Sequence, residues 1–134
     1  MIPCANPGAQ YHAHRHAIDE AIARVLERGR YILGDETQCF EQEFAEYVGV
    51  EHAIAVGSGT EALHITLRAF DIGAGDEVIT VSHTAVATVA AIELCGACPV
   101  LVDINPQSYT LEPSAVEAAI TPRTKVILRP SGVS

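Results

Sequence analysis

Residues 53–60 have the sequence AIAVGSGT, in which a short apolar run leads into a glycine-containing loop. The apolar run predicts a strand at 53–56, and the spacing of apolar residues beyond the loop predicts a helix at 60–70. Two glycines allow the backbone to turn sharply between these elements and leave amide groups uncovered. A strand, a glycine loop and a helix in this order are typical of α/β proteins.

The same alternation continues along the chain. Strands are predicted at 77–81, 99–103 and 125–128, with helices at 84–94 and 113–120 between them. Helical crossovers of this length connect parallel strands with right-handed topology. The predicted fold class is therefore α/β, a three-layer α-β-α arrangement around a mostly parallel sheet, and such sheets bind ligands at the carboxyl ends of their strands.

The residues before this alternation are expected to be helical. Apolar positions recur every three or four residues at 14–28 and 36–48, and Gly29 and Gly49 follow as terminators. We therefore predict a single domain. Its parts are a helical N-terminal segment at 1–50, a βαβ core at 51–128 and an irregular tail at 129–134.

Composition restricts the classes of function. The 134 residues are 49% hydrophobic and 19% charged, which suffices for a compact core, and the formal net charge is -9. That charge disfavours nucleic acid and anionic membranes as partners. There is no apolar stretch of membrane-spanning length and no signal-peptide pattern, so we expect a cytoplasmic protein whose four cysteines are reduced.

The glycine loop is a candidate anion site. The first amides of a helix have no partner within it, and the helix dipole adds partial positive charge. A phosphate could be held by Ser58, by Thr60 and by the amides of Thr60 and Glu61. An ordinary glycine turn with a helix-capping hydroxyl explains the same residues. Both the lysine of a Walker loop and the third glycine of a dinucleotide loop are missing from this sequence.

Several other motifs accompany the loop in a fixed order. They are GAGDEVIT at 73–80, SHTAVAT at 82–88, GACPVLVDI at 96–104, YTLEP at 109–113 and AITPRTK at 119–125. Together these blocks closely resemble the DegT/DnrJ/EryC1/StrS family of sugar aminotransferases, and the resemblance extends from about residue 2 to residue 128.

The resemblance implies a fold, a cofactor and a reaction. The fold would be part of the large domain of the aspartate-aminotransferase (type I) fold, and the protein would act as a homodimer. The cofactor would be pyridoxal 5'-phosphate (PLP), with pyridoxamine phosphate (PMP) as its aminated form. The reaction would move an amino group, usually from glutamate, to a nucleotide-linked keto sugar in polysaccharide or antibiotic-sugar biosynthesis.

The resemblance also assigns the glycine loop to the cofactor. Ser58, Gly59, Thr60 and Glu61 correspond to the loop that grips the cofactor phosphate, chiefly through Thr60 and the amide that follows it.

A second segment, at 82–88, matches the family segment that passes over the pyridine ring. The family commonly has an aromatic residue at the position of Ala85, so we assign the ring contact to His83 and include Thr88 in the same segment. The alternative for His83 is a surface residue at a strand end.

The chain lacks the group that would bind such a cofactor covalently. In the family a lysine does so, and a carboxylate pairs with the pyridine nitrogen; both lie downstream of the matching region. The one lysine here, Lys125, lies in the motif TPRTK that leads into a strand, and Asp103 matches a strand-terminal aspartate. We therefore predict no catalytic residue and expect a truncated form that is inactive alone.

Other interpretations remain open at this stage. A noncatalytic Rossmann-type nucleotide- or phosphate-binding module would need a ribose-binding acid about 20 residues after the loop, where Asp76 and Glu77 occur in a turn. A remnant unable to fold would aggregate through uncovered strand surfaces.

Two further groups of residues could bind metals. His12, His14 and His16 would share one face of an extended segment but lack an acidic or cysteine partner. Cys95 and Cys98 form a C-x-x-C without a second pair. We predict no metal site.

Overall fold

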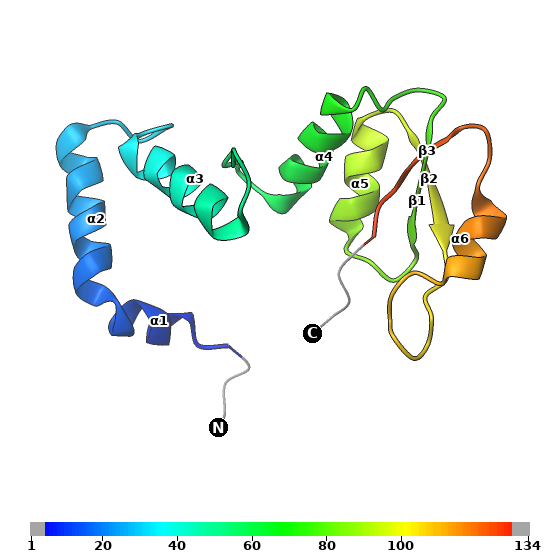
Figure 1. Ribbon diagram of the computed structural model, residues 1–134. Helices are drawn as coiled ribbons and strands as arrows, with labels where there is room; N and C mark the ends of the chain where they lie inside the picture. Colours follow the sequence, from blue (N-terminus) through cyan, green and yellow to red (C-terminus); the bar gives the residue numbers. More distant parts are fainter. Residues whose placement is uncertain (1–4, 130–134) are drawn as a thin grey trace. The chain divides into compact units, whose positions relative to one another are not determined.

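The computed structural model describes residues 5–129 (Figure 1). Internal contacts divide the chain into two compact units, Met1–Ala55 and Val56–Ser134. None of the helices within residues 5–129 combines the length and the apolar composition that a membrane span needs. The single predicted domain stays a prediction, and most of the predicted irregular tail, together with Cys4, lies outside the described residues.

The first unit consists of three helices, α1 (Pro7–Ala13), α2 (Arg15–Arg28) and α3 (Asp35–Val48). The two longer ones confirm the predicted helices. They end at Gly29 and Gly49, whose φ angles of 65° and 78° lie in the left-handed region that glycine adopts without strain. The sequence reasoning missed α1, although a proline at its first position is a common helix start.

The histidine-rich segment is helical, so the extended geometry that a three-histidine metal site would require is not present at these residues. His12 lies in α1 and His16 in α2, while His14 forms the junction between the two helices. Side chains two residues apart point to different sides of a helix, whereas they share one face in a strand. The shared face that a three-histidine metal site would require does not form.

Ion pairs connect α2 to α3. The guanidinium of Arg24 donates to both carboxylate oxygens of Glu36, at 2.8 and 3.3 Å, and Arg28 Nη1 lies 2.6 Å from Asp35 Oδ2. The hydrogen bond from Arg24 lowers the pKa of Glu36. Because all four side chains are partly open to solvent, each pair stabilises the hairpin weakly.

The second unit contains a parallel three-stranded sheet. Its elements are α4 (Gly59–Ala69), β1 (Glu77–Val81), α5 (Val86–Leu94), β2 (Cys98–Val102), α6 (Pro113–Ala119) and β3 (Thr124–Ile127). The strand order is β2-β1-β3, with Glu77 paired to both Cys98 and Thr124. These elements confirm the predicted helices and strands of this region within two residues at each end, and they confirm the α/β class.

Helices cover both faces of this sheet. The chain moves from β1 to β2 through α5, then back past β1 to β3 through α6. Two right-handed crossovers that run in opposite directions place their helices on opposite faces. Figure 1 shows α5 and α6 on the two sides of the strands, which is the predicted three-layer arrangement.

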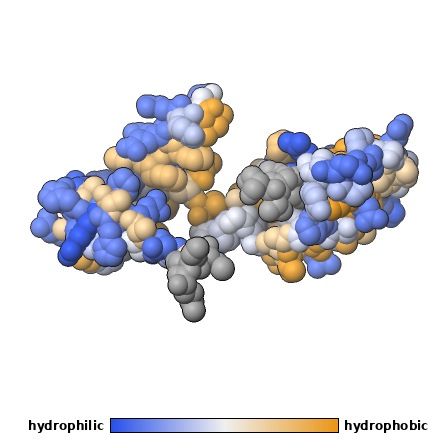
Figure 2. Space-filling view, turned by 90° about the horizontal axis from the view of Figure 1, so that it is seen from below, coloured by the Kyte–Doolittle hydropathy of each residue, from blue (hydrophilic) through white to orange (hydrophobic). Residues whose placement is uncertain are grey.

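The central strand carries the core. All five residues of β1 are buried, and Val78 packs with Leu67 and Ile92 from the two helices on one face. Hydrophobic side chains nevertheless reach the surface in both units (Figure 2). A central strand that is buried along its whole length between two helical layers is the pattern expected for parallel sheets.

The predicted strand at 53–56 does not form. These residues have no strand conformation within the described part of the chain, and Ile54 is 81% exposed. A strand needs a neighbour that accepts and donates its backbone hydrogen bonds, and neither β2 nor β3 pairs with this segment. The prediction rested on apolar composition alone, which is not sufficient for a strand in the described part of the chain.

Candidate functional site

The predicted site lies at the carboxyl edge of the sheet. In the second unit the chain reverses direction between α4 and β1 and again between β1 and α5, so both helices run antiparallel to β1 and begin at its carboxyl end (Figure 1). The two helices also pack against each other. Their free N-terminal amides, with the partial positive charge of the helix dipoles, therefore face the same edge.

Ser58 caps the start of α4. Its backbone is extended, and its Oγ accepts a hydrogen bond from the amide of Glu61 at 3.2 Å. The Glu61 side chain folds back, and its Oε2 accepts a hydrogen bond from the amide of Gly57 at 2.8 Å. Two of the amides around the loop are thus satisfied by the loop's own side chains, in a variant of the capping box. The amide of Glu61, which we predicted as a phosphate donor, is therefore already bonded to Ser58 Oγ in this structure.

Two other amides of the loop stay open. Gly59 N and Thr60 N have no hydrogen-bond partner within residues 5–129. A Cβ built on Gly59 would meet no atom within 4 Å, so the space over this glycine is empty. An anion such as a phosphate ester fits the arrangement, because two adjacent donors at a helix N-terminus face unobstructed space.

The segment after β1 places the remaining predicted residues. Ser82 continues the sheet through a hydrogen bond from its amide to the carbonyl of Val102, and His83 next to it is exposed. Thr88 lies in the first turn of α5, where its hydroxyl is 2.9 Å from that of Thr84 and its side chain is buried. His83 is therefore accessible to a ligand at this edge, whereas Thr88 contributes to the packing beneath it.

Sequence reasoning did not assign a site role to Asp103. The structure brings it to the carboxyl end of β2, where its Oδ1 accepts a hydrogen bond from Ser82 Oγ at 3.3 Å. Both residues directly follow buried strand ends, and both are exposed. A polar residue immediately after each of two neighbouring parallel strands is the signal that could have predicted this pair.

The connection from β2 to α6 is held by Asn105. Its Oδ1 accepts hydrogen bonds from the amides of Gln107 and Ser108, and its Nδ2 donates to Glu112 at 2.7 Å. That bond, with one from Ser114, lowers the pKa of Glu112. The loop next to Asp103 is therefore ordered by local hydrogen bonds.

Lys125 lies away from this edge. It is the second residue of β3, next to the amino end of the sheet, and it is exposed. Since β3 is parallel to β1, the Ser58–Thr60 loop lies at the opposite end of the unit. That Lys125 has no role toward a cofactor stays a prediction.

Known proteins similar to this chain include several aminotransferases. The profile of the DegT/DnrJ/EryC1/StrS aminotransferase family matches residues 12–131. A dTDP-3-amino-3,4,6-trideoxy-alpha-D-glucose transaminase of Streptomyces venezuelae is 48% identical over 95% of this chain and 34% of its own length. A UDP-2-acetamido-2-deoxy-3-oxo-D-glucuronate aminotransferase of Pseudomonas aeruginosa is 50% identical over 83% of this chain and 31% of its own.

Solved structures show the same similarity. The crystal structure of S. venezuelae DesV has a TM-score of 0.92 at 48% identity, covering 96% of this chain and 34% of that one. A Bacillus subtilis structure, ntda with bound cofactor PMP, has a TM-score of 0.83 at 37% identity, covering 87% and 27%. The chain thus spans about one third of the length of the relatives it matches. By its sequence and by its fold, the chain belongs to the DegT/DnrJ/EryC1/StrS aminotransferase family.

Proposed function

We propose that this chain is the cofactor-phosphate-binding part of a PLP-dependent aminotransferase that acts on a nucleotide-linked keto sugar. The observation that carries the proposal is the open pair of amides at Gly59 and Thr60, beneath unobstructed space at the start of α4. The names of the relatives support the substrate class, because both name a transaminase of a dTDP- or UDP-linked sugar.

The residues of this chain would bind and orient the cofactor. The amides of Gly59 and Thr60 donate hydrogen bonds to phosphate oxygens, and the dipole of α4 favours the negative charge. Ser58 holds the first turn of the helix in place through its bond from Glu61 N. His83, which is exposed after the end of β1, would contact the pyridine ring. When bound, the cofactor supplies the electron sink for amino transfer.

Turnover would require groups that this chain does not contain. Transamination needs a lysine near the cofactor and a carboxylate at the pyridine nitrogen. Lys125 lies toward the amino end of the sheet, and Asp103 is engaged with Ser82. We therefore propose that the chain binds PLP or PMP but does not catalyse transamination by itself. We also propose that a homodimer and an amino-acid donor are needed only for the complete reaction, as it would occur in proteins of the relatives' length. We also propose a cytoplasmic location.

The two acids that a Rossmann-type module would use to bind ribose, Asp76 and Glu77, do not lie where such a module needs them. Asp76 accepts a hydrogen bond from Gly73 N at 3.0 Å and so closes the turn before β1. Glu77 is engaged by residues that precede β3. Both acids lie at the amino end of the sheet, whereas a ribose-binding acid is required at the carboxyl end.

Equilibrium dialysis of the purified chain with PMP tests the proposal. PMP is the suitable probe because its amine cannot form a Schiff base with Lys125 or with the N-terminus. We expect saturable PMP binding that pyridoxamine without phosphate does not reproduce, and we expect Thr60→Glu to abolish it, because a carboxylate would be placed at the phosphate position. Thr66→Glu, on an exposed part of α4, is the matched control.

Either of two results would contradict the proposal. One is PMP binding by Thr60→Glu as tight as by the unaltered chain. The other is binding of a dinucleotide such as NAD in preference to PMP, which would favour the Rossmann-type module.

A further inference from the structure

Glu61 occupies an unexpected position for a residue beside an anion site. Its carboxylate lies over the N-terminal side of the loop, where Oε2 accepts the hydrogen bond from Gly57 N at 2.8 Å. Its own amide is held by Ser58 Oγ. Glu61 thus forms hydrogen bonds to both residues that precede α4, to Gly57 through its carboxylate and to Ser58 through its amide.

Direct contact between this carboxylate and a phosphate is unfavourable. Like charges in contact repel, and the chain already carries a formal net charge of -9. The hydrogen bond to Gly57 resolves this conflict by holding the carboxylate on the side of the loop that precedes the helix. The open amides of Gly59 and Thr60 lie on the helix side.

We propose that Glu61 is a positioning residue, which acts on the cofactor phosphate through Gly57 and not by contact. The inference rests on the proposed function of the loop. By bonding to Gly57 N, the carboxylate fixes the backbone that leads into Ser58 and Gly59, so that the two open amides keep their direction before the anion arrives. Such preorganisation strengthens binding because less conformational freedom is lost on association.

Gly57 is the matching half of this arrangement. A Cβ added at Gly57 would lie 2.6 Å from Glu61 Oε2, closer than real Cβ contacts. The φ angle of Gly57 is not among the positive values that disfavour alanine. An alanine at this position would therefore leave the backbone conformation permissible and push the carboxylate away, so Gly57→Ala tests the same contact from the opposite side.

The experiment compares PMP binding by the full chain with Glu61→Ala, Glu61→Gln, Gly57→Ala and the double variant Gly57→Ala/Glu61→Ala. Glu61→Ala should weaken binding about three- to tenfold, the effect of losing one capping hydrogen bond. Glu61→Gln keeps an acceptor for Gly57 N and removes the charge, so it should bind as well as the unaltered chain or more tightly. Gly57→Ala should weaken binding like Glu61→Ala, and the double variant no further, because both remove one interaction.

Alternative roles for Glu61 predict other orders of affinity. If Glu61 contacts the cofactor directly, Gln and Ala will both weaken binding. If it acts merely as a nearby charge, both will strengthen it. If it merely stabilises α4, thermal unfolding will shift while the affinity of the folded fraction stays unchanged. Each of these results overturns the inference. Absence of PMP binding by the unaltered chain would instead overturn the proposed function of the loop.

Discussion

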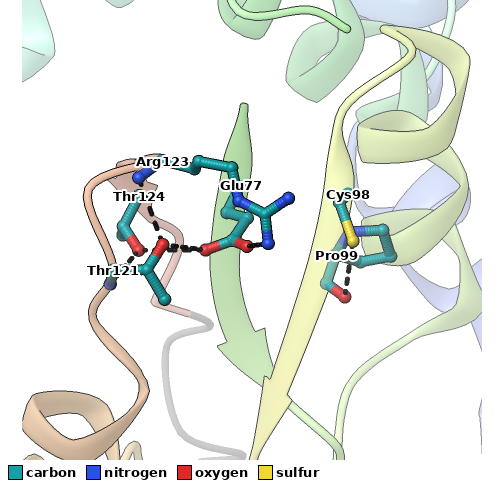
Figure 3. Close-up of polar contacts among 6 residues, drawn as sticks. All are labelled: Glu77, Cys98, Pro99, Thr121, Arg123 and Thr124. Carbon is teal, nitrogen blue, oxygen red and sulfur yellow. Dashed lines mark hydrogen bonds and ion pairs between the residues drawn. The ribbon is translucent and has the colours of Figure 1, made fainter. Parts of the chain in front are cut away.

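Arg123 Nη2 lies 2.5 Å from Glu77 Oε1 and so joins the turn before β3 to the first residue of β1 (Figure 3). The hydroxyls of Thr121 and Thr124 donate to the other carboxylate oxygen, at 2.5 and 3.4 Å. The Glu77 side chain is 6% exposed, whereas that of Arg123 is 69% exposed. The motif that precedes β3 therefore satisfies a buried carboxylate and fixes where β3 pairs with β1.

Replacing Glu77 should destabilise the sheet unit. Glu77→Ala removes the acceptor of three donors and should lower the free energy of unfolding by about 2 kcal/mol. Glu77→Gln keeps one acceptor and should cost about 1 kcal/mol. Urea denaturation followed by circular dichroism measures both. Arg123→Ala is the control, and it should lower the free energy of unfolding by less than about 1 kcal/mol because solvent screens this ion pair. A larger loss of stability for Arg123→Ala than for Glu77→Ala would contradict this account.

Ser58 should contribute to stability as a helix cap. Ser58→Ala removes the acceptor for Glu61 N and should cost about 1 kcal/mol, whereas Ser58→Asp, which keeps an acceptor, should cost much less. Thermal unfolding compares the two variants. If Ser58→Ala and Ser58→Asp lower the unfolding temperature equally, the side-chain acceptor at this position does not contribute to stability.

The hairpin of α2 and α3 should weaken in acid. The hydrogen bond that Arg24 donates to Glu36 lowers the pKa of Glu36 in the folded chain below the ordinary value of 4.5. A carboxyl group whose folded pKa is lowered contributes stability that is present above its unfolded pKa and is lost as the pH falls through the folded pKa. Glu36→Gln should remove this part of the pH dependence below about pH 4.5. Unfolding profiles of both proteins between pH 3 and 7 test this; parallel profiles would refute it.

We expect the isolated chain to self-associate through its edge strand β3. A groove of about 540 Å³ between α4 and β3 is lined by Leu63, Leu67, Phe70, Val126, Ile127 and Leu128, and Phe70 is 73% exposed. Exposed apolar strand edges promote intermolecular pairing, and lysine on an edge suppresses it. Ile127→Lys should therefore shift the chain toward the monomer in sedimentation velocity. Lys125→Arg, which adds no charge, is the control, and an unchanged distribution for Ile127→Lys would exclude this surface.

Sequence patterns predicted the sheet unit well because its elements are bounded by strong local signals. Glycine or proline lies near most ends of its helices and strands, and Val78, Ile79 and Val81 give β1 a mostly apolar sequence. The pattern failed at 53–56, because an apolar run does not form a strand where no neighbouring strand pairs with it in the described residues. It also missed α1, which begins at a proline and precedes the predicted helix at 14–28.

The candidate site was predictable in its location but not in its internal bonds. The glycines and Ser58 indicated an anion loop, and the family resemblance indicated the cofactor. The fold-back of Glu61 onto Gly57 and the pairing of Ser82 with Asp103 depend on side-chain rotamers and on strand order. The polar residues after β1 and β2, and the spacing of Ser58 and Glu61, are compatible with these bonds, but only the structure shows which atoms pair.

The position of β1 between two later strands limits when this protein can fold during synthesis. Both strands that satisfy its backbone, β2 and β3, are translated after it. A nascent chain that has left the ribosome through β2 still has one open edge on β1, the strand that is buried at all five residues in the folded unit. The sheet unit can close around β1 only once Thr124–Ile127 have emerged, so slow translation of residues 103–127 would prolong the time that chaperones must protect it.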